Sequence, residues 1–196
     1  MEKIIERVKS ILLSPKDALN AVKTEEMTVV GTMKEYVVIV AAIPAVALFI
    51  GYALIGLPLV GRYNIGRTLI FAALYYILSL ISVFIIGKII NALAPSFNAV
   101  KNDLNAFKLA VYSLTPGFIA GVFYIIPSLQ ILTWLGALYG IYILYLGIPI
   151  LMEAPQEKAV AYTVVSLIVG FIAMVIIWVI AGALAWGGGA VPARYF

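Results

Sequence analysis

The side chains that could do chemistry in this chain are hydroxyls, carboxylates and amines, because the sequence contains no histidine and no cysteine. This excludes a Ser-His-Asp triad, a thiolate nucleophile, and metal sites built from imidazole or thiolate ligands. An aspartyl dyad needs two carboxylates held together, whereas Asp17 and Asp103 lie in separate polar segments. We therefore expect a protein that is not an enzyme, with no catalytic residue, no metal site and no cofactor.

One group of polar side chains could line a small cavity or a hinge within the membrane. Pro116 cannot donate a backbone hydrogen bond to the carbonyl of Tyr112, and tyrosine hydroxyls need partners where they are buried. Either a polar cavity between the third and fourth apolar segments or hydrogen bonding within a helix bundle would satisfy these groups. The candidate residues are Tyr112, Thr115, Pro116, Tyr139, Tyr142 and Tyr145.

Small residues recur at a spacing of four in the same two segments. In lipid, helices associate through close packing, which small side chains permit. The pattern predicts either packing between the third and fourth segments or a seam between two copies of the chain. The residues are Ser113, Gly117, Gly121, Gly136, Gly140 and, seven positions further on, Gly147.

Three lysines lie at or beside the ends of apolar segments, namely Lys88, Lys101 and Lys108. They could contact lipid headgroups at the inner interface, or they could simply extend to the interface and set the topology. In the same connector, Asn102 or Asp103 is suited to cap the helix that follows.

The composition indicates an integral membrane protein. Of 196 residues, 64% are hydrophobic and 11% are charged, and the mean hydropathy is +1.11, whereas soluble domains are about a quarter charged. We expect an all-α, polytopic protein with five transmembrane helices preceded by short amphipathic helices. Residues 1–35 form a cytoplasmic leader, and the membrane domain spans 36–186. The expected spans are 36–60, 68–93, 106–126, 129–152 and 159–186.

The leader itself predicts two short helices. Apolar residues from Ile4 to Leu12 recur at helical spacing, and Ser14 followed by Pro15 is typical of a new helix start. The final segment, 187–196, begins with three glycines and is expected to be a flexible tail outside the cell.

The distribution of basic residues predicts the orientation. With the N-terminus inside, ten lysines and arginines lie on the inner side and three on the outer side, as the positive-inside rule requires. This places the protein in the cell membrane with a cytoplasmic N-terminus and an external C-terminus. Since the basic residues report orientation, no nucleic-acid partner is expected.

Several motifs resemble the Yip domain family (Ypt-interacting proteins), in its prokaryotic branch. They are Leu12-Leu13-Ser14-Pro15-Lys16-Asp17-Ala18, Ala106-Phe107-Lys108, Tyr112-Ser113-Leu114-Thr115-Pro116, Ile126-Pro127 and the run from Leu138 to Pro149. The resemblance implies five spans with a cytoplasmic N-terminus. It also implies a role in membrane organisation, because eukaryotic members act in vesicle trafficking and bind Rab-type small GTPases, largely through a longer cytoplasmic N-terminal region.

Two functions remain open from the sequence. The first is a non-enzymatic membrane scaffold or adaptor that binds membrane lipids, a second copy of itself, or a cytoplasmic protein through residues 1–24. The second is a small transporter or channel for a neutral or weakly polar solute or lipid, with a pathway between the third and fourth spans.

Overall fold

The computed structural model describes residues 2–57 and 61–186 of the chain, and this part is helical apart from short connectors, with no strand. The all-α prediction is thereby confirmed. The expected tail, 187–196, lies outside the described residues. The α-helices are α1 (Glu2–Leu13), α2 (Pro15–Thr24), α3 (Val29–Thr32), α4 (Val38–Phe49), α5 (Ile65–Leu93), α6 (Asp103–Ala120), α7 (Thr133–Leu151) and α8 (Ala159–Trp186).

Segments of π- and 3₁₀-helix extend several of these helices. The π-helices η1 (Met33–Val37) and η2 (Ile50–Ile55) flank α4. The 3₁₀-helices η3 (Ala94–Phe97), η4 (Gly121–Ile125), η5 (Pro127–Leu132) and η6 (Gln156–Lys158) lie at helix ends. With these extensions, four stretches of the described residues are long and apolar enough to cross a membrane, namely Val29–Ile55, Ile65–Phe97, Asp103–Ile125 and Pro127–Leu151.

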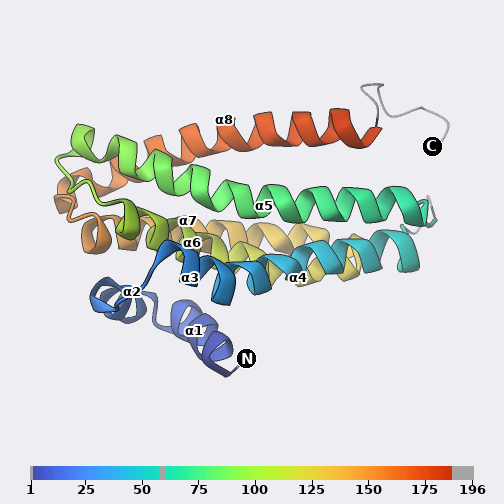
Figure 1. Cartoon of the computed structure of the whole chain (residues 1–196), viewed down its shortest axis with the longest axis horizontal. Helices are drawn as coiled ribbons and strands as arrows, with labels where there is room; N and C mark the ends of the chain where they lie inside the picture. Colours follow the sequence, from blue (N-terminus) through green and yellow to red (C-terminus); the bar gives the residue numbers. More distant parts are fainter. Residues whose placement is uncertain (1, 58–60, 187–196) are drawn as a thin grey trace.

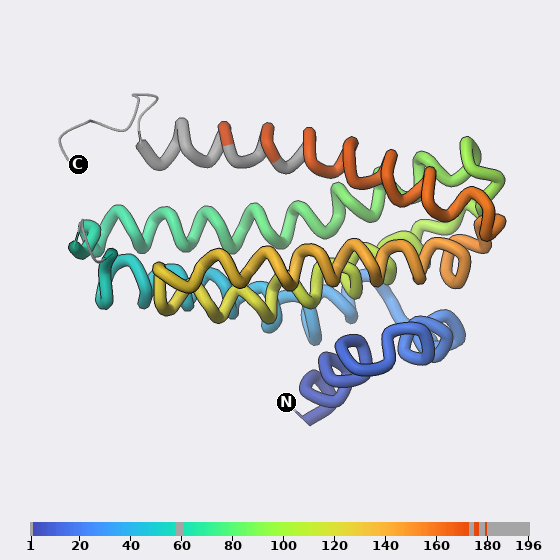
Figure 2. The backbone as a smooth tube through the Cα atoms, turned by 180° about the vertical axis from the view of Figure 1, so that it is seen from behind, coloured from blue at the N-terminus to red at the C-terminus, as the bar shows by residue number. Residues whose placement is uncertain are grey.

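The long helices run side by side as a bundle, and α1 and α2 lie against one side of it (Figure 1). The view from behind shows the two short helices beside the half of the bundle where α5 ends and α8 begins (Figure 2). Helix α6 lies at the centre, in contact with α4, α5 and α7, while α8 packs mainly on α5. Large apolar side chains such as Ile77, Leu138 and Ile168 are more than half exposed, which suits a surface surrounded by lipid.

The leader helices bury part of their apolar surface in the bundle, although Ile5 and Leu13 of α1 are exposed. Ile11, Leu19 and Val22 are completely buried, and α2 packs on α7 while α1 contacts α6. Pro15 begins α2 as its position predicts, although the Ser14 hydroxyl makes no capping hydrogen bond. The amphipathic pattern alone left open whether this surface lies on lipid or on protein, and the structure places Ile11, Leu19 and Val22 on protein.

Glycines bring α6 and α7 into backbone contact. A Cβ atom at Gly140 would lie 2.3 Å from the carbonyl oxygen of Ser113, and one at Gly136 would lie 2.4 Å from the carbonyl oxygen of Pro116. The other small residues have different neighbours. A Cβ at Gly121 would meet Pro44 of α4, one at Gly147 would meet Leu109 and Leu19, and one at Gly117 would meet nothing within 4 Å.

Gly140, whose Cβ position is crowded, and Gly117, whose Cβ position is open, should respond differently to substitution by alanine. We expect Gly140→Ala to destabilise the purified protein by about 1–3 kcal/mol, because its methyl group overlaps the Ser113 carbonyl. Gly117→Ala is the matched control, since its methyl group enters open space and alanine is the better helix former. Thermal unfolding in detergent should give a Tm below that of the wild type for Gly140→Ala only. Equal losses for both would contradict the packing described.

Candidate functional site

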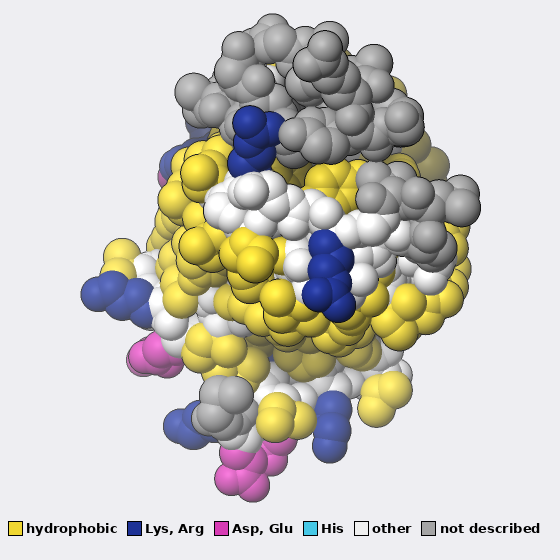
Figure 3. Space-filling view, turned by 90° about the vertical axis from the view of Figure 1, so that its right-hand side faces the viewer, with side chains coloured by type: hydrophobic (Ala, Val, Ile, Leu, Met, Phe, Trp, Pro, Cys, Tyr) yellow, Lys and Arg dark blue, Asp and Glu magenta, His cyan; other side chains and the backbone are white. Residues whose placement is uncertain are grey.

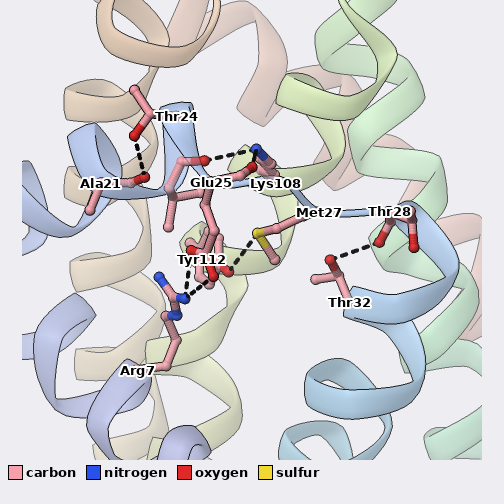
Figure 4. Close-up of polar contacts among 10 residues, drawn as sticks. Arg7, Ala21, Thr24, Glu25, Met27, Thr28, Thr32, Lys108 and Tyr112 are labelled. Atoms are coloured by element: carbon pink, nitrogen blue, oxygen red, sulfur yellow. Dashed lines mark hydrogen bonds and ion pairs between the residues drawn. The ribbon is translucent and has the colours of Figure 1, made fainter.

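Lys108 lies inside the protein, where α2 meets α6. Its side chain is 1% exposed, and Nζ donates hydrogen bonds to the carbonyl oxygens of Val22 at 2.7 Å and Glu25 at 2.9 Å (Figure 4). The last carbonyl groups of a helix lack intrahelical partners and carry partial negative charge. The headgroup contact expected for Lys108 is therefore wrong: the leader folds over α6 and covers the ammonium group.

Glu25 links this end of α2 to α1. Arg7 donates from Nη2 to both carboxylate oxygens of Glu25, at 2.6 and 2.7 Å, and its guanidinium carbon lies 5.9 Å from the centre of the Tyr112 ring. Both the ion pair and the ring contact are favourable for a planar guanidinium. The Glu25 residue thus contacts α6 through its carbonyl oxygen and α1 through its carboxylate (Figure 4).

Two tyrosines form the wall behind this ion pair. The rings of Tyr36 and Tyr112 are 5.7 Å apart, and both side chains are buried. The Tyr112 hydroxyl points to the sulfur of Met27 at 3.9 Å. The Thr115 hydroxyl donates to the carbonyl of Val111, so its oxygen can accept from the hydroxyl of Tyr36, 3.1 Å away.

These residues border a cavity of about 390 Å³, which we call the leader cavity. It lies between α1, the connector after α2, and α3 with η1, which begin the long helical stretch Val29–Ile55. Its charged lining residues are Lys3, Arg7, Glu25, Glu26 and Glu35. Tyr36, Tyr112, Ile4 and Met27 supply aromatic and apolar surface. The sequence does not predict this cavity, because the leader pattern does not specify which part of the bundle α1 covers.

The six residues expected to line a cavity between the third and fourth spans do not converge. Pro116 lies in the α6–α7 contact, whereas Tyr139 donates to the carbonyl oxygen of Leu12 in α1 at 2.8 Å. Tyr142 is 48% exposed, and Tyr145 accepts a hydrogen bond from Gln156. Of the six, only Tyr112 lines the leader cavity. A cavity of about 270 Å³ does border α6 and α7, but Ser113, Gly117 and Gly140 line it and none of the six does.

The remaining lysines stay near the surface. Lys88 pairs with Asp103 at 2.7 Å, and both side chains are largely exposed. Asn102 caps α6 by accepting from the backbone N–H of Asn105, whereas Asp103 bonds Lys88 and Asn91 and is not the cap. Lys101 is exposed, so a headgroup contact at Lys88 or Lys101 stays a prediction.

A second cavity, of about 380 Å³, lies at the other end of the bundle. Tyr52, Tyr63 and Tyr124 line it, and the Tyr52 hydroxyl donates to the side-chain oxygen of Gln130. Figure 3 views the molecule from this end, where apolar side chains make up most of the face and charged side chains are few. Among the described residues, no group of carboxylates is arranged to hold a metal ion.

Comparison with known proteins agrees with the resemblance noted from the motifs. The Yip1 domain family matches residues 9–177. Inner membrane protein YohC of Escherichia coli strain K12, and the same protein from a second E. coli strain, are 26% identical to this chain over 192 residues. The matched region covers 89% of this chain and 93% of each relative. No solved structure matches the chain. Because the match covers most of the chain, from α1 into α8, the protein belongs to the Yip1 domain family.

Proposed function

We propose that the protein is a non-enzymatic adaptor of the inner membrane, whose leader presents a fixed, charged face to a cytoplasmic protein. The observation that carries this proposal is that Ile11, Leu19 and Val22 anchor the leader in the bundle while most of its charged side chains are exposed. The relatives named as inner membrane proteins support the location.

Contacts with two helices and with the connector after α7 hold the leader in place. Lys108 of α6 bonds the end of α2, and Tyr139 of α7 bonds the end of α1. Lys23 pairs with Glu153, just after α7, at 2.8 Å. A surface held in this way loses little conformational entropy when a partner binds. The residues exposed on it include Glu2, Glu6, Lys9, Lys16 and Asp17.

We further propose five spans with the N-terminus inside. Helix α8 is the fifth span in this proposal, because its 28 residues would reach about 42 Å at 1.5 Å per residue. None of them is charged. An odd number of spans puts the two termini on opposite sides, in agreement with the ten basic residues on the inner side against three on the outer side.

The close packing of α6 against α7 disfavours the transport alternative. That alternative requires a pathway between the third and fourth spans, and there the Cβ positions of Gly136 and Gly140 lie within 2.4 Å of carbonyl oxygens of α6. A pathway at this interface would require the two helices to separate.

Single cysteines test the topology, because the chain has none of its own. In intact cells, a membrane-impermeant maleimide should label Arg67→Cys and Arg194→Cys, the latter outside the described residues. Lys9→Cys should be labelled only after the membrane is permeabilised. External labelling of Lys9→Cys would disprove the orientation. If neither Arg194→Cys nor Lys9→Cys were labelled in intact cells, the odd number of spans would be disproved.

The adaptor proposal is tested by photo-crosslinking from the leader in native membranes. A photo-reactive residue at Glu6 should give a discrete protein adduct, and the charge reversal Lys9→Glu should weaken it, because both side chains lie on the exposed face. Leu138, which is 60% exposed on the bundle, and Lys101 on another inner connector are the control positions.

Adducts with lipid alone, or the same protein adducts from all positions, would count against an adaptor surface. Deletion of residues 1–24 is a poor test. It would expose the bundle surface that Leu19 covers and would remove the Val22 carbonyl that Lys108 bonds.

A further inference from the structure

The leader cavity brings charges of both signs together at the membrane boundary. Helix α1 contributes Lys3 and Arg7, and the chain after α2 contributes Glu25, Glu26 and Glu35. Glu35 is the last charged residue before an uncharged stretch that runs to Arg62. The cavity therefore lies where the polar leader gives way to the hydrocarbon-spanning part of the first long helix.

Several of these charged groups have bonding capacity to spare. Arg7 uses only Nη2 for Glu25, and a guanidinium group carries five N–H donors. The hydrogens on Nη1 and Nε make no further bond to the described residues. Within the described residues, Lys3, Glu26 and Glu35 have no ion-pair partner. A ligand could thus meet donors from α1 and carboxylates from the chain after α2 without breaking the Arg7–Glu25 pair.

The charge balance limits the ligand. Two basic and three acidic side chains line the cavity, which disfavours a ligand carrying only negative charge. A molecule with one phosphate and one ammonium group would match both kinds of lining residue. Carboxylates favour an ammonium group with N–H donors, whereas a quaternary ammonium group has none and is usually bound by aromatic faces. Of the two rings that line this cavity, that of Tyr112 already lies beside the Arg7 guanidinium group. The apolar lining from Ile4 and Met27 suits a ligand that also has a hydrocarbon part.

We propose that the leader cavity binds the headgroup of a zwitterionic phospholipid with a primary amine, the phosphate on Lys3 and Arg7 and the ammonium on Glu26 and Glu35. This cavity is separate from the exposed outer face assigned to a protein partner. The lipid site and the adaptor surface can therefore be tested independently, and failure of one proposal would not disprove the other.

Lipid binding to the full chain in detergent, measured by native mass spectrometry, tests the site. The probes are phosphatidylethanolamine, phosphatidylcholine and phosphatidylglycerol with identical acyl chains. We expect the wild type to bind the ethanolamine lipid roughly tenfold more tightly than the other two, as a charge-assisted hydrogen bond would provide. Glu35→Gln should remove most of the difference in affinity between the ethanolamine and choline lipids. Lys3→Gln should weaken the binding of both of these lipids.

Glu157→Gln and Lys16→Gln are the matched controls, because they make the same charge changes outside the cavity. Both should bind as the wild type does, and an unchanged Tm would show that each variant is folded. Equal affinity of the wild type for the three lipids would overturn the proposal. So would an ethanolamine preference that survives Glu35→Gln, or displacement of the lipid by an equimolar amount of free O-phosphoethanolamine.

Discussion

The structure of the leader depends on one buried ammonium group. Lys108 comes from the second turn of α6 and is 1% exposed, and a buried charge without partners would be strongly unfavourable. Its partners are the carbonyl oxygens of Val22 and Glu25. Because Glu25 also holds Arg7, the position of Lys108 fixes the end of α2, the near wall of the leader cavity and the approach of α1.

Local sequence signals were enough to predict the helices and the family. Proline at position 15 begins α2, Asn102 caps α6, and the polar connectors separate the long apolar helices. These features depend on residues that are close in the sequence, so composition and spacing report them directly. The same holds for the motifs that resemble the Yip domain family, which the family match confirmed.

The site could not be predicted because it depends on contacts between distant residues. Lys108 bonds Val22 across 86 positions, and Tyr139 bonds Leu12 across 127. A lysine near the end of an apolar segment has the same sequence pattern whether it extends to the headgroups or caps another helix. Likewise, mid-span tyrosines need hydrogen-bond partners, but nothing local shows that Tyr139 turns to the leader while Tyr142 stays exposed. The small-residue spacing indicated close packing, and only the fold shows that α6 and α7 supply both sides of it.

Hydrogen exchange of the leader amides in lipid nanodiscs tests the central role of Lys108 most directly. The wild type should protect α1 and α2, because part of their apolar surface is buried in the bundle. Lys108→Met should speed exchange throughout α2, since it removes the ammonium group that bonds the carbonyl oxygens of Val22 and Glu25. Lys88→Met, which removes an exposed ion pair, should leave leader exchange unchanged. An unprotected leader in the wild type, or equal exchange in the two variants, would contradict the account.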